Sequence, residues 1–246
     1  MPFNVLYMFY YFVMQVAFNF AVADVADWYA RLSPVALPFM RRSPIGQLVK
    51  SMISARTRDL VSTAAYDRLV AHYRGPLAIA KAAPADVAGI IRDVTFPDAK
   101  AEQLVTALRE IAASDAGFAL DHLAESPLGE ALAWLERLPG VARKVSASTL
   151  NASMLGRPVM IVDTHVLRVL QRLGFVPTTA DYRTCSEAVT AAMPDWKGDD
   201  FLSFHIALKR LGQAVCRWDV PECAACPLAA DCPTAKAGRG RQFISG

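Results

Sequence analysis

The sequence lacks any convincing stretch of alternating apolar and polar residues, the pattern of a half-buried β-strand. It also lacks an internal repeat of fixed period and a low-complexity linker. These absences argue against β-sheet and repeat architectures. From Asp24 onward the chain is instead a succession of short amphipathic helical patterns, so we expect an all-α protein.

A strong excess of one charge is also missing. The 246 residues carry 26 Lys and Arg against 23 Asp and Glu, a formal net charge of +3. This small value neither requires nor excludes a nucleic-acid partner, because a local basic patch matters more than the total. A hydrophobic content of 54% with 20% charged residues excludes a disordered chain and indicates a globular one.

The first 23 residues contain no charged side chain. The run is long enough to span a bilayer, but it lacks the positive region with which a signal peptide begins. We favour two interpretations over a membrane anchor: an extra packed helix, or a start codon placed upstream of Met8 or Met14. The status of residues 1–23 as an extension stays open.

Two apolar patterns place helices with one buried face. The first is Ile45, Leu48, Val49, Met52 and Ile53, and the second is Leu104, Val105, Leu108 and Ile111, before which Asp98 is expected to act as the N-cap. Asp163 is expected to cap a later helix that ends at Gly174.

The five cysteines are distributed unevenly, since four follow the pattern Cys216-x6-Cys223-x2-Cys226-x5-Cys232. Four thiolates suit either tetrahedral zinc or an iron-sulfur cluster. Zinc ribbons usually use two tight Cys-x2-Cys pairs, and here only one pair is tight, so the spacing favours a cluster while zinc stays open. Cys185 stands alone and is interpreted as a buried apolar residue.

The string Leu138-Pro139-Gly140-Val141-Ala142-Arg143-Lys144 predicts two helices joined by a tight turn. Backbone amides at the start of the second helix could bind a phosphate without reading a base. Gly140 would allow close approach of the backbone, and Arg143 could add a charge to the same phosphate. Alone, such a turn is more often a simple helix connector.

A third motif, Val162-Asp163-Thr164-His165, lies nineteen residues beyond Lys144. In isolation Asp163 is a helix cap and Lys144 lies on a solvated face. Together, and in this order with the four cysteines, the three motifs resemble the endonuclease III family of helix-hairpin-helix DNA glycosylases. The resemblance covers roughly Arg42 to Cys232 and includes Ser54-Ala55 and Lys100-Ala101-Glu102.

The resemblance implies a two-domain helix-hairpin-helix glycosylase fold. A six-helix barrel domain would span residues 37–156. Residues 24–36 and 157–246 would form a second helical domain, which carries a 4Fe-4S cluster on Cys216, Cys223, Cys226 and Cys232.

By the same resemblance, Lys144 would be the nucleophile and Asp163 the essential carboxylate of a base-excision-repair DNA glycosylase with β-elimination lyase activity at abasic sites. Burial, or the cation of Arg143, would lower the pKa of Lys144. Relatives that place Ser or Tyr at this point are monofunctional, so lyase activity rests on Lys144.

The expected partner is double-stranded DNA with a damaged base or an abasic site, and oxidised or otherwise modified pyrimidines are the leading substrates. Uracil or a mismatched pyrimidine opposite guanine stays open. The rivals are a non-catalytic 4Fe-4S DNA-binding protein and a zinc-containing nucleic-acid binder. We expect a cytoplasmic, nucleoid-associated monomer with no obligate protein partner.

Two further positions, Arg56 and Phe96, each allow two interpretations. Arg56 stands where the family has a glutamine that fills the space of the flipped nucleotide, so it could plug that gap or bind phosphate. Phe96 falls at the apolar wedge position, and a core phenylalanine is the alternative. The expected DNA-binding residues are Leu138, Gly140, Val141, Arg143, Arg56, Phe96 and His165.

Overall fold

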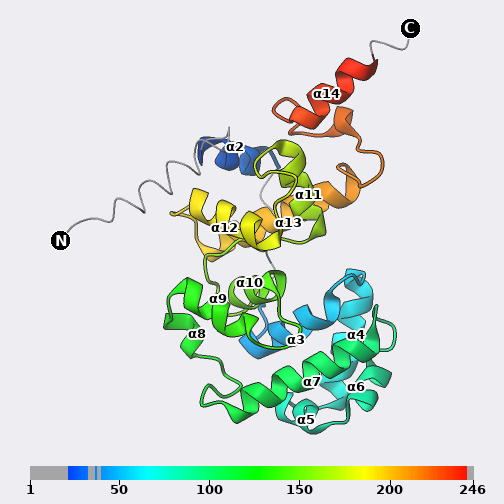
Figure 1. Ribbon diagram of the computed structural model, residues 1–246, viewed down its shortest axis with the longest axis vertical. Coiled ribbons are helices and arrows are strands. Elements are labelled where there is room, and N and C mark those ends of the chain that lie inside the picture. The colour runs from blue at the N-terminus through cyan, green and yellow to red at the C-terminus, as the bar shows by residue number, and fades with distance from the viewer. Residues whose placement is uncertain (1–21, 33–36, 38–39, 243–246) are drawn as a thin grey trace, which may run out of the picture. The chain divides into compact units, whose positions relative to one another are not determined.

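A computed structural model describes residues 22–32, 37 and 40–242, and the chain elsewhere is outside the description (Figure 1). Within the described residues the structure is helical and has no strand, apart from one isolated bridge between Arg42 and Ser153. The all-α prediction is confirmed. The interpretations of residues 1–23 fall almost wholly outside the described residues.

The chain divides into two compact units. The larger comprises residues 38–161 and 197–201, and the smaller comprises 1–37, 162–196 and 202–246. Residues 157–161 and 197–201 thus belong to the larger unit, although we expected them in the cluster domain. Hydrogen bonds from the Asn151 side chain to the carbonyls of Arg157 and Gly198 hold the two segments there.

The larger unit contains eight helical segments where six were expected, and three of them are short. They are α3 (Pro44–Ser54), α4 (Asp59–His72), α5 (Pro76–Lys81), α6 (Pro84–Ile90), α7 (Pro97–Ala113), α8 (His122–Glu125), α9 (Leu128–Glu136) and α10 (Arg143–Ala152). Proline stands in the first turn of α3, α5, α6 and α7, where its fixed φ suits the helix and its missing N–H is not needed.

Both predicted apolar faces form the core of this unit. Every residue named for the faces of α3 and α7 is at most 9% exposed. The predicted cap Asp98 was wrong, because Pro97 starts α7 one residue earlier and the N-cap is Phe96. Asp98 lies inside the first turn, where a carboxylate still meets the positive end of the helix favourably.

Helix α10 is tied to α3 through a buried polar contact set. The Gln47 amide donates to the hydroxyls of Ser51 (3.0 Å) and Ser148 (3.1 Å), and Ser51 Oγ bonds Ser148 Oγ at 3.0 Å. Buried polar groups that satisfy one another specify a single arrangement of the two helices. The register of α10, which carries Lys144, is thereby set against α3.

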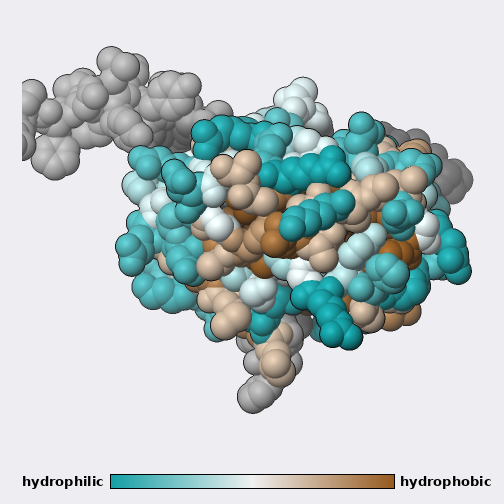
Figure 2. Space-filling model, turned by 90° about the horizontal axis from the view of Figure 1, so that it is seen from below, coloured by the Kyte–Doolittle hydropathy of each residue, from teal (hydrophilic) through white to brown (hydrophobic). Residues whose placement is uncertain are grey.

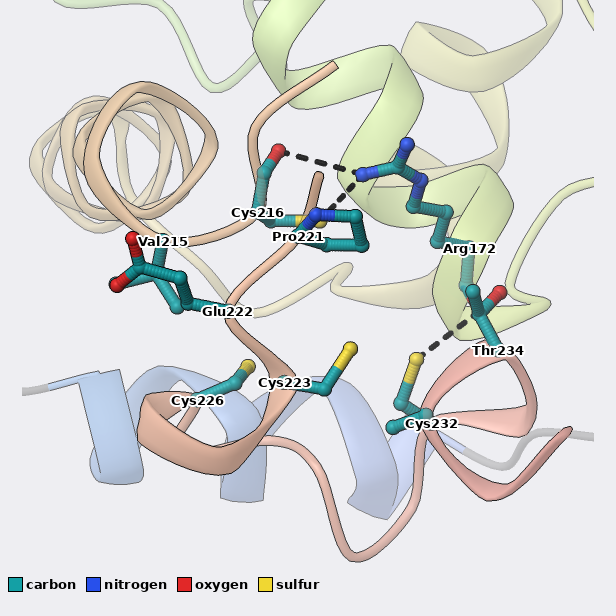
Figure 3. Close-up of a pocket in the computed structure, with 10 residues that line it drawn as sticks. Arg172, Val215, Cys216, Pro221, Glu222, Cys223, Cys226, Cys232 and Thr234 are labelled. Atoms are coloured by element: carbon teal, nitrogen blue, oxygen red, sulfur yellow. Dashed lines mark hydrogen bonds between the residues drawn. The ribbon is translucent and has the colours of Figure 1, made fainter. Parts of the chain in front are cut away.

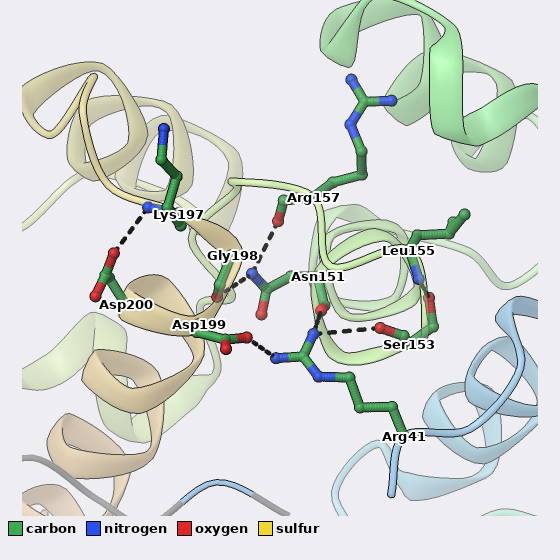
Figure 4. A network of polar contacts seen from close by, with 9 residues as sticks. All are labelled: Arg41, Asn151, Ser153, Leu155, Arg157, Lys197, Gly198, Asp199 and Asp200. Atoms are coloured by element: carbon green, nitrogen blue, oxygen red, sulfur yellow. Dashed lines mark hydrogen bonds and ion pairs between the residues drawn. The ribbon is translucent and has the colours of Figure 1, made fainter.

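The C-terminal end of α10 is held by a second network, drawn in Figure 4. The Asn151 amide donates to the carbonyls of Arg157 (2.9 Å) and Gly198 (2.8 Å). Arg41 donates to Asn151 O at 2.7 Å and pairs with Asp199. This network joins three segments far apart in sequence, which explains why residues 197–201 pack with the larger unit.

Among its described residues, the smaller unit contains five helices and a short 3-10 turn. They are α2 (Val22–Leu32), α11 (Thr164–Leu173), α12 (Tyr182–Ala192), α13 (Gly198–Ala214), whose first four residues belong to the larger unit, η1 (Cys223–Ala225) and α14 (Pro233–Gln242). Its core is rich in aromatic side chains, with Tyr29, Trp196 and Phe204 in mutual contact at centroid distances of 5.1 to 5.7 Å. Arg31 on α2 pairs with Asp231, so the segment before the larger unit joins the C-terminal part of the chain.

None of the helices described here combines the length and apolar character that crossing a membrane requires. The face displayed in Figure 2 mixes apolar and hydrophilic residues. That mixture agrees with a chain in which only 20% of the residues are charged.

Candidate active site

The turn between α9 and α10 is the tight helix connection that the sequence predicted. Gly140 has φ of +75°, and a Cβ there would lie 2.6 Å from Gln103 Oε1. Both the left-handed backbone and this close approach require glycine. Gly140 and Ala142 are exposed, whereas the side chains of Leu138 and Val141 are 7% and 5% exposed. Those two residues could therefore contact DNA through their backbone only.

Arg143 does not face outward, which corrects the prediction that it binds a phosphate. Its Nε donates to Glu136 Oε1 at 2.6 Å, and both side chains are below 10% exposed. Ser146 Oγ donates to the same carboxylate oxygen at 2.8 Å. A buried charge without a partner is costly, so the pairing of Arg143 with Glu136 stabilises both side chains in their buried positions. Arg143 thus fastens α10 to α9.

Lys144 lies in the first turn of α10 and is half-buried. No side chain caps this turn, since its N-cap residue is Ala142. A cation near Lys144 is Lys100 on α7, which is 8% exposed. Burial, and then the charge of Lys144, lower the pKa of Lys100 to about 8. From the sequence we expected Arg143 to be the neighbouring cation and expected no role for Lys100.

Asp163 is the N-cap of α11, as predicted. Its Oδ1 accepts from the amides of His165 (2.9 Å) and Val166 (3.0 Å), and Gly174 in the left-handed conformation ends the helix. The carboxylate is half-buried. Asp163 belongs to the smaller unit and Lys144 to the larger one.

His165 is half-buried beside α13. A Cβ on Gly212 would meet the His165 Cβ at 2.8 Å, so glycine there allows the two helices to approach. Arg168 Nη2 contacts the His165 ring at 3.3 Å. The structure therefore assigns His165 a packing position, and its expected contact with DNA stays a prediction.

Arg56 and Phe96 are both exposed, Phe96 to 61%. The alternative of a core phenylalanine is wrong. Each residue has a left-handed backbone, with φ of +54° and +57°. Both belong to the larger unit, as does Lys144.

The four clustered cysteines line one cavity, between the end of α13, η1 and the start of α14 (Figure 3). Among the described residues, no group of three or more His, Cys, Asp or Glu side chains is placed to hold a single metal ion. Cys185 is fully buried elsewhere, and burial raises the pKa of its thiol to about 12, which agrees with the predicted apolar role.

Two arginines of α11 hold the loop that begins at Cys216. Arg172 donates to the carbonyls of Arg217 (2.6 Å) and Trp218 (2.8 Å), and its Nη1 lies 3.4 Å from Cys216 Sγ. The Arg172 carbonyl accepts from Cys232 Sγ at 3.2 Å (Figure 3). Arg168 donates to Cys216 O at 2.9 and 3.1 Å. Sequence reasoning missed both arginines, because nothing in the helical pattern indicates a loop more than forty residues away.

The burial of Lys100, by contrast, could have been predicted from the sequence. It lies four residues before Leu104 and eight before Leu108, on the apolar face of α7. A lysine in line with a buried face predicts a buried ammonium, which needs acceptors.

Known proteins resemble this chain in sequence and in fold. The family model of the HhH-GPD superfamily base excision DNA repair protein matches residues 49–194, more than half of the chain. Endonuclease III of Thermotoga maritima is 31% identical over 189 residues, covering 77% of this chain and 82% of that protein. Endonuclease III of Escherichia coli K12 is 28% identical, covering 75% and 81%.

Solved structures show the same fold. A trapped endonuclease III–DNA covalent intermediate has a TM-score of 0.70 at 23% identity and covers 92% of this chain and 98% of that one. A thermostable thymine-DNA glycosylase has a TM-score of 0.68 at 20% identity and covers 88% and 95%. With the family model and the Thermotoga relative, these likenesses lead to one conclusion. The chain belongs to the HhH-GPD superfamily of base excision DNA repair proteins and, within it, to the endonuclease III family.

Proposed function

We propose that this protein is a bifunctional DNA glycosylase and abasic-site lyase that removes oxidised or otherwise modified pyrimidines from duplex DNA. The observation that carries the proposal is the placement of Lys144. In a chain of this family, a half-buried lysine occupies the uncapped first turn of the helix that follows the Leu138–Gly140 turn. Burial, and then the charge of Lys144, lower the pKa of the nearby Lys100 to about 8, so the two ammonium groups are close enough to interact. Attack on the sugar requires the neutral amine of Lys144.

The reaction starts when the damaged nucleotide rotates out of the stack, because its glycosidic bond is otherwise out of reach. The lone pair of Lys144 Nζ forms a bond to C1′ as the bond to the base breaks and the base leaves with its electrons. Sugar-ring opening gives a Schiff base that makes the 2′ hydrogen acidic. Loss of that proton expels the 3′ phosphate, and water then releases the lysine.

Asp163 would stabilise the cationic sugar as the base departs and help to move the proton from the amine. The two amides of α11 that bond its Oδ1 fix the orientation of the carboxylate. A negative charge at this position is compatible with the positive end of α11.

DNA would be gripped by the backbone of Gly140 and Ala142, which is exposed at the start of α10. Arg56 would fill the gap left by the flipped nucleotide, and Phe96 would act as the wedge. An arginine only donates hydrogen bonds, so it could address the O6 and N7 acceptors of an orphaned guanine. His165 is a further proposed contact.

A 4Fe-4S cluster would be held by Cys216, Cys223, Cys226 and Cys232. All four line one cavity, and four thiolates with a single tight Cys-x2-Cys pair suit such a cluster. When bound, the cluster would keep the loop between Cys216 and Cys223 in shape. An anaerobically purified cluster protein is yellow-brown, whereas a zinc protein is colourless.

Borohydride trapping on an abasic-site oligonucleotide tests the proposal. The wild type should form a covalent adduct and Lys144→Ala should form none. Lys81→Ala is the matched control, since this exposed lysine lies on α5 of the same unit. Equal trapping by Lys144→Ala and the wild type would show that Lys144 is not the nucleophile. A panel of lesions opposite guanine or adenine, run with Arg56→Gln, then identifies the substrate.

A further inference from the structure

Arg56 and Phe96 share an unusual backbone conformation. Only three non-glycine residues in the described part of the chain have positive φ, and these two are exposed while the third, Leu120, is fully buried. The left-handed conformation is unfavourable for a residue that carries a Cβ. Such strain persists only where surrounding contacts impose it, and it concentrates at functional sites.

The two strained positions are joined by hydrogen bonds. Thr95 Oγ1 donates to the carbonyl of Arg56 at 2.9 Å, and the Thr95 amide donates to Thr57 Oγ1 at 3.1 Å. Thr95 directly precedes Phe96, and Thr57 directly follows Arg56. A shift of either turn would therefore break contacts that hold the other.

Lys100 completes this link from inside the protein. Its ammonium donates to the carbonyls of Ile53 (2.9 Å) and Ala55 (2.6 Å) and to Thr57 Oγ1 (3.1 Å). Its backbone amide donates to Phe96 O at 3.2 Å. One residue thus bonds the turn that carries Arg56 through its side chain and the turn that carries Phe96 through its backbone.

We propose that Lys100, Thr57 and Thr95 form a positioning unit that presets Arg56 and Phe96, so that DNA meets the two side chains as a preformed pair. The inference rests on the proposed function, in which these side chains enter the duplex. Ordering a flexible turn on binding lowers affinity, and a turn ordered beforehand avoids that loss. The unit should therefore matter for duplex DNA and not for a single-stranded abasic site, which has no partner base or stack to invade.

The threonines give the cleanest test, because a change at Lys100 would also alter the charge beside Lys144. Thr95→Val removes the hydroxyl and keeps the shape. We expect kcat/KM for lesion excision from duplex DNA to fall about three- to tenfold, the effect of one or two side chains that must be ordered on binding. Cleavage of a single-stranded abasic oligonucleotide should stay within about twofold of wild type.

Two further variants control this experiment. Thr95→Ser keeps the hydroxyl and should restore duplex excision. Thr190→Val removes a hydroxyl that donates to Ser186 O on α12 in the other unit, and it should leave both reactions unchanged. In a background of Arg56→Ala and Phe96→Ala, Thr95→Val should have no further effect, because it acts through those side chains.

A DNA-binding measurement that requires neither base excision nor strand cleavage distinguishes this inference from the proposed function. The base 2-aminopurine, placed opposite the lesion, should brighten on binding of wild type and much less with Thr95→Val. The inference is overturned by an equal rise in fluorescence, by equal losses on single-stranded and duplex substrates, or by additive effects in the triple variant. Absence of strand cleavage by wild type, with the fluorescence difference intact, would overturn the proposed function alone.

Discussion

Two helix N-termini carry the two proposed catalytic side chains, and they are built in opposite ways. Helix α11 begins with a carboxylate that caps it, since Asp163 Oδ1 bonds two of its first amides. Helix α10 has no side-chain cap and carries Lys144 in its first turn instead. The positive end of a helix stabilises an anion and destabilises a cation. The same feature of helices is therefore capped by a carboxylate in one unit and left without a side-chain cap beside a lysine in the other.

The largest expected effect separates capping from catalysis at Asp163. Asp163→Asn keeps an oxygen that can accept from the α11 amides, so unfolding in urea should shift by less than about 1 kcal/mol. Base excision should nevertheless fall by about 10³-fold or more, because the variant loses the negative charge that we propose stabilises the cationic sugar. Single-turnover kinetics on duplex DNA would measure this loss.

Asp181 provides the matched control for that comparison. It caps α12 of the same unit through a bond from the Thr184 amide at 2.8 Å. Asp181→Asn should leave both stability and excision near wild type. If Asp163→Asn behaved in the same way, Asp163 would be a cap and nothing more.

The second-largest expected effect concerns the buried ion pair that fastens α10 to α9. Glu136→Gln leaves the buried guanidinium of Arg143 without its charge partner, and breaking such a pair costs about 3 to 5 kcal/mol. Urea unfolding monitored by circular dichroism should show this loss. The double variant Glu136→Gln with Arg143→Met should recover much of it, since no buried charge is left unpaired. Equal stability of Glu136→Gln and wild type would contradict the role of this pair.

The smallest expected effect depends on pH and comes from Lys100. Its pKa is about 8 in the folded protein against an ordinary 10.5, so between these values the unfolded chain binds more protons at this site. Stability contributed by Lys100 therefore rises as pH increases from about 8 to 10.5, where the cost of burying the ammonium is relieved. The free energy of unfolding of wild type minus that of Lys100→Met should increase over this window. A flat difference would show that Lys100 is not held in a charge-disfavouring environment.

Much of the fold could be predicted because it depends on local pattern. The buried faces of α3 and α7, the cap at Asp163 and the end of α11 at Gly174 follow from periodicity and capping chemistry. The place of Lys144 in the first turn of α10 also followed, because the Leu138–Gly140 turn predicted a helix that starts just after it. The prediction for Asp98 failed because Pro97, one residue earlier, set the start of α7.

The orientation of Arg143 could not be predicted in the same way. A basic residue at the start of a helix beside a glycine turn is equally compatible with a phosphate contact and with a buried pair. The choice depended on Glu136, which lies on the preceding helix and could approach only once the turn at Gly140 had brought α9 against α10. Two charges that can pair inside the protein satisfy each other there.

The helical class and the starts and ends of several helices could be predicted from local patterns, because each depends on residues within a few positions of one another. The spacing of the lysine, aspartate and cysteine motifs is likewise a property of the chain before it folds. The neighbours of Lys100 depend instead on helix packing, since its ammonium bonds carbonyls 45 and 47 residues earlier in the chain. The packing also joins the turn of Arg56 to the turn of Phe96 through hydrogen bonds of Thr95. Such contacts arise when separate helices pack, and no local pattern specifies which turns then meet.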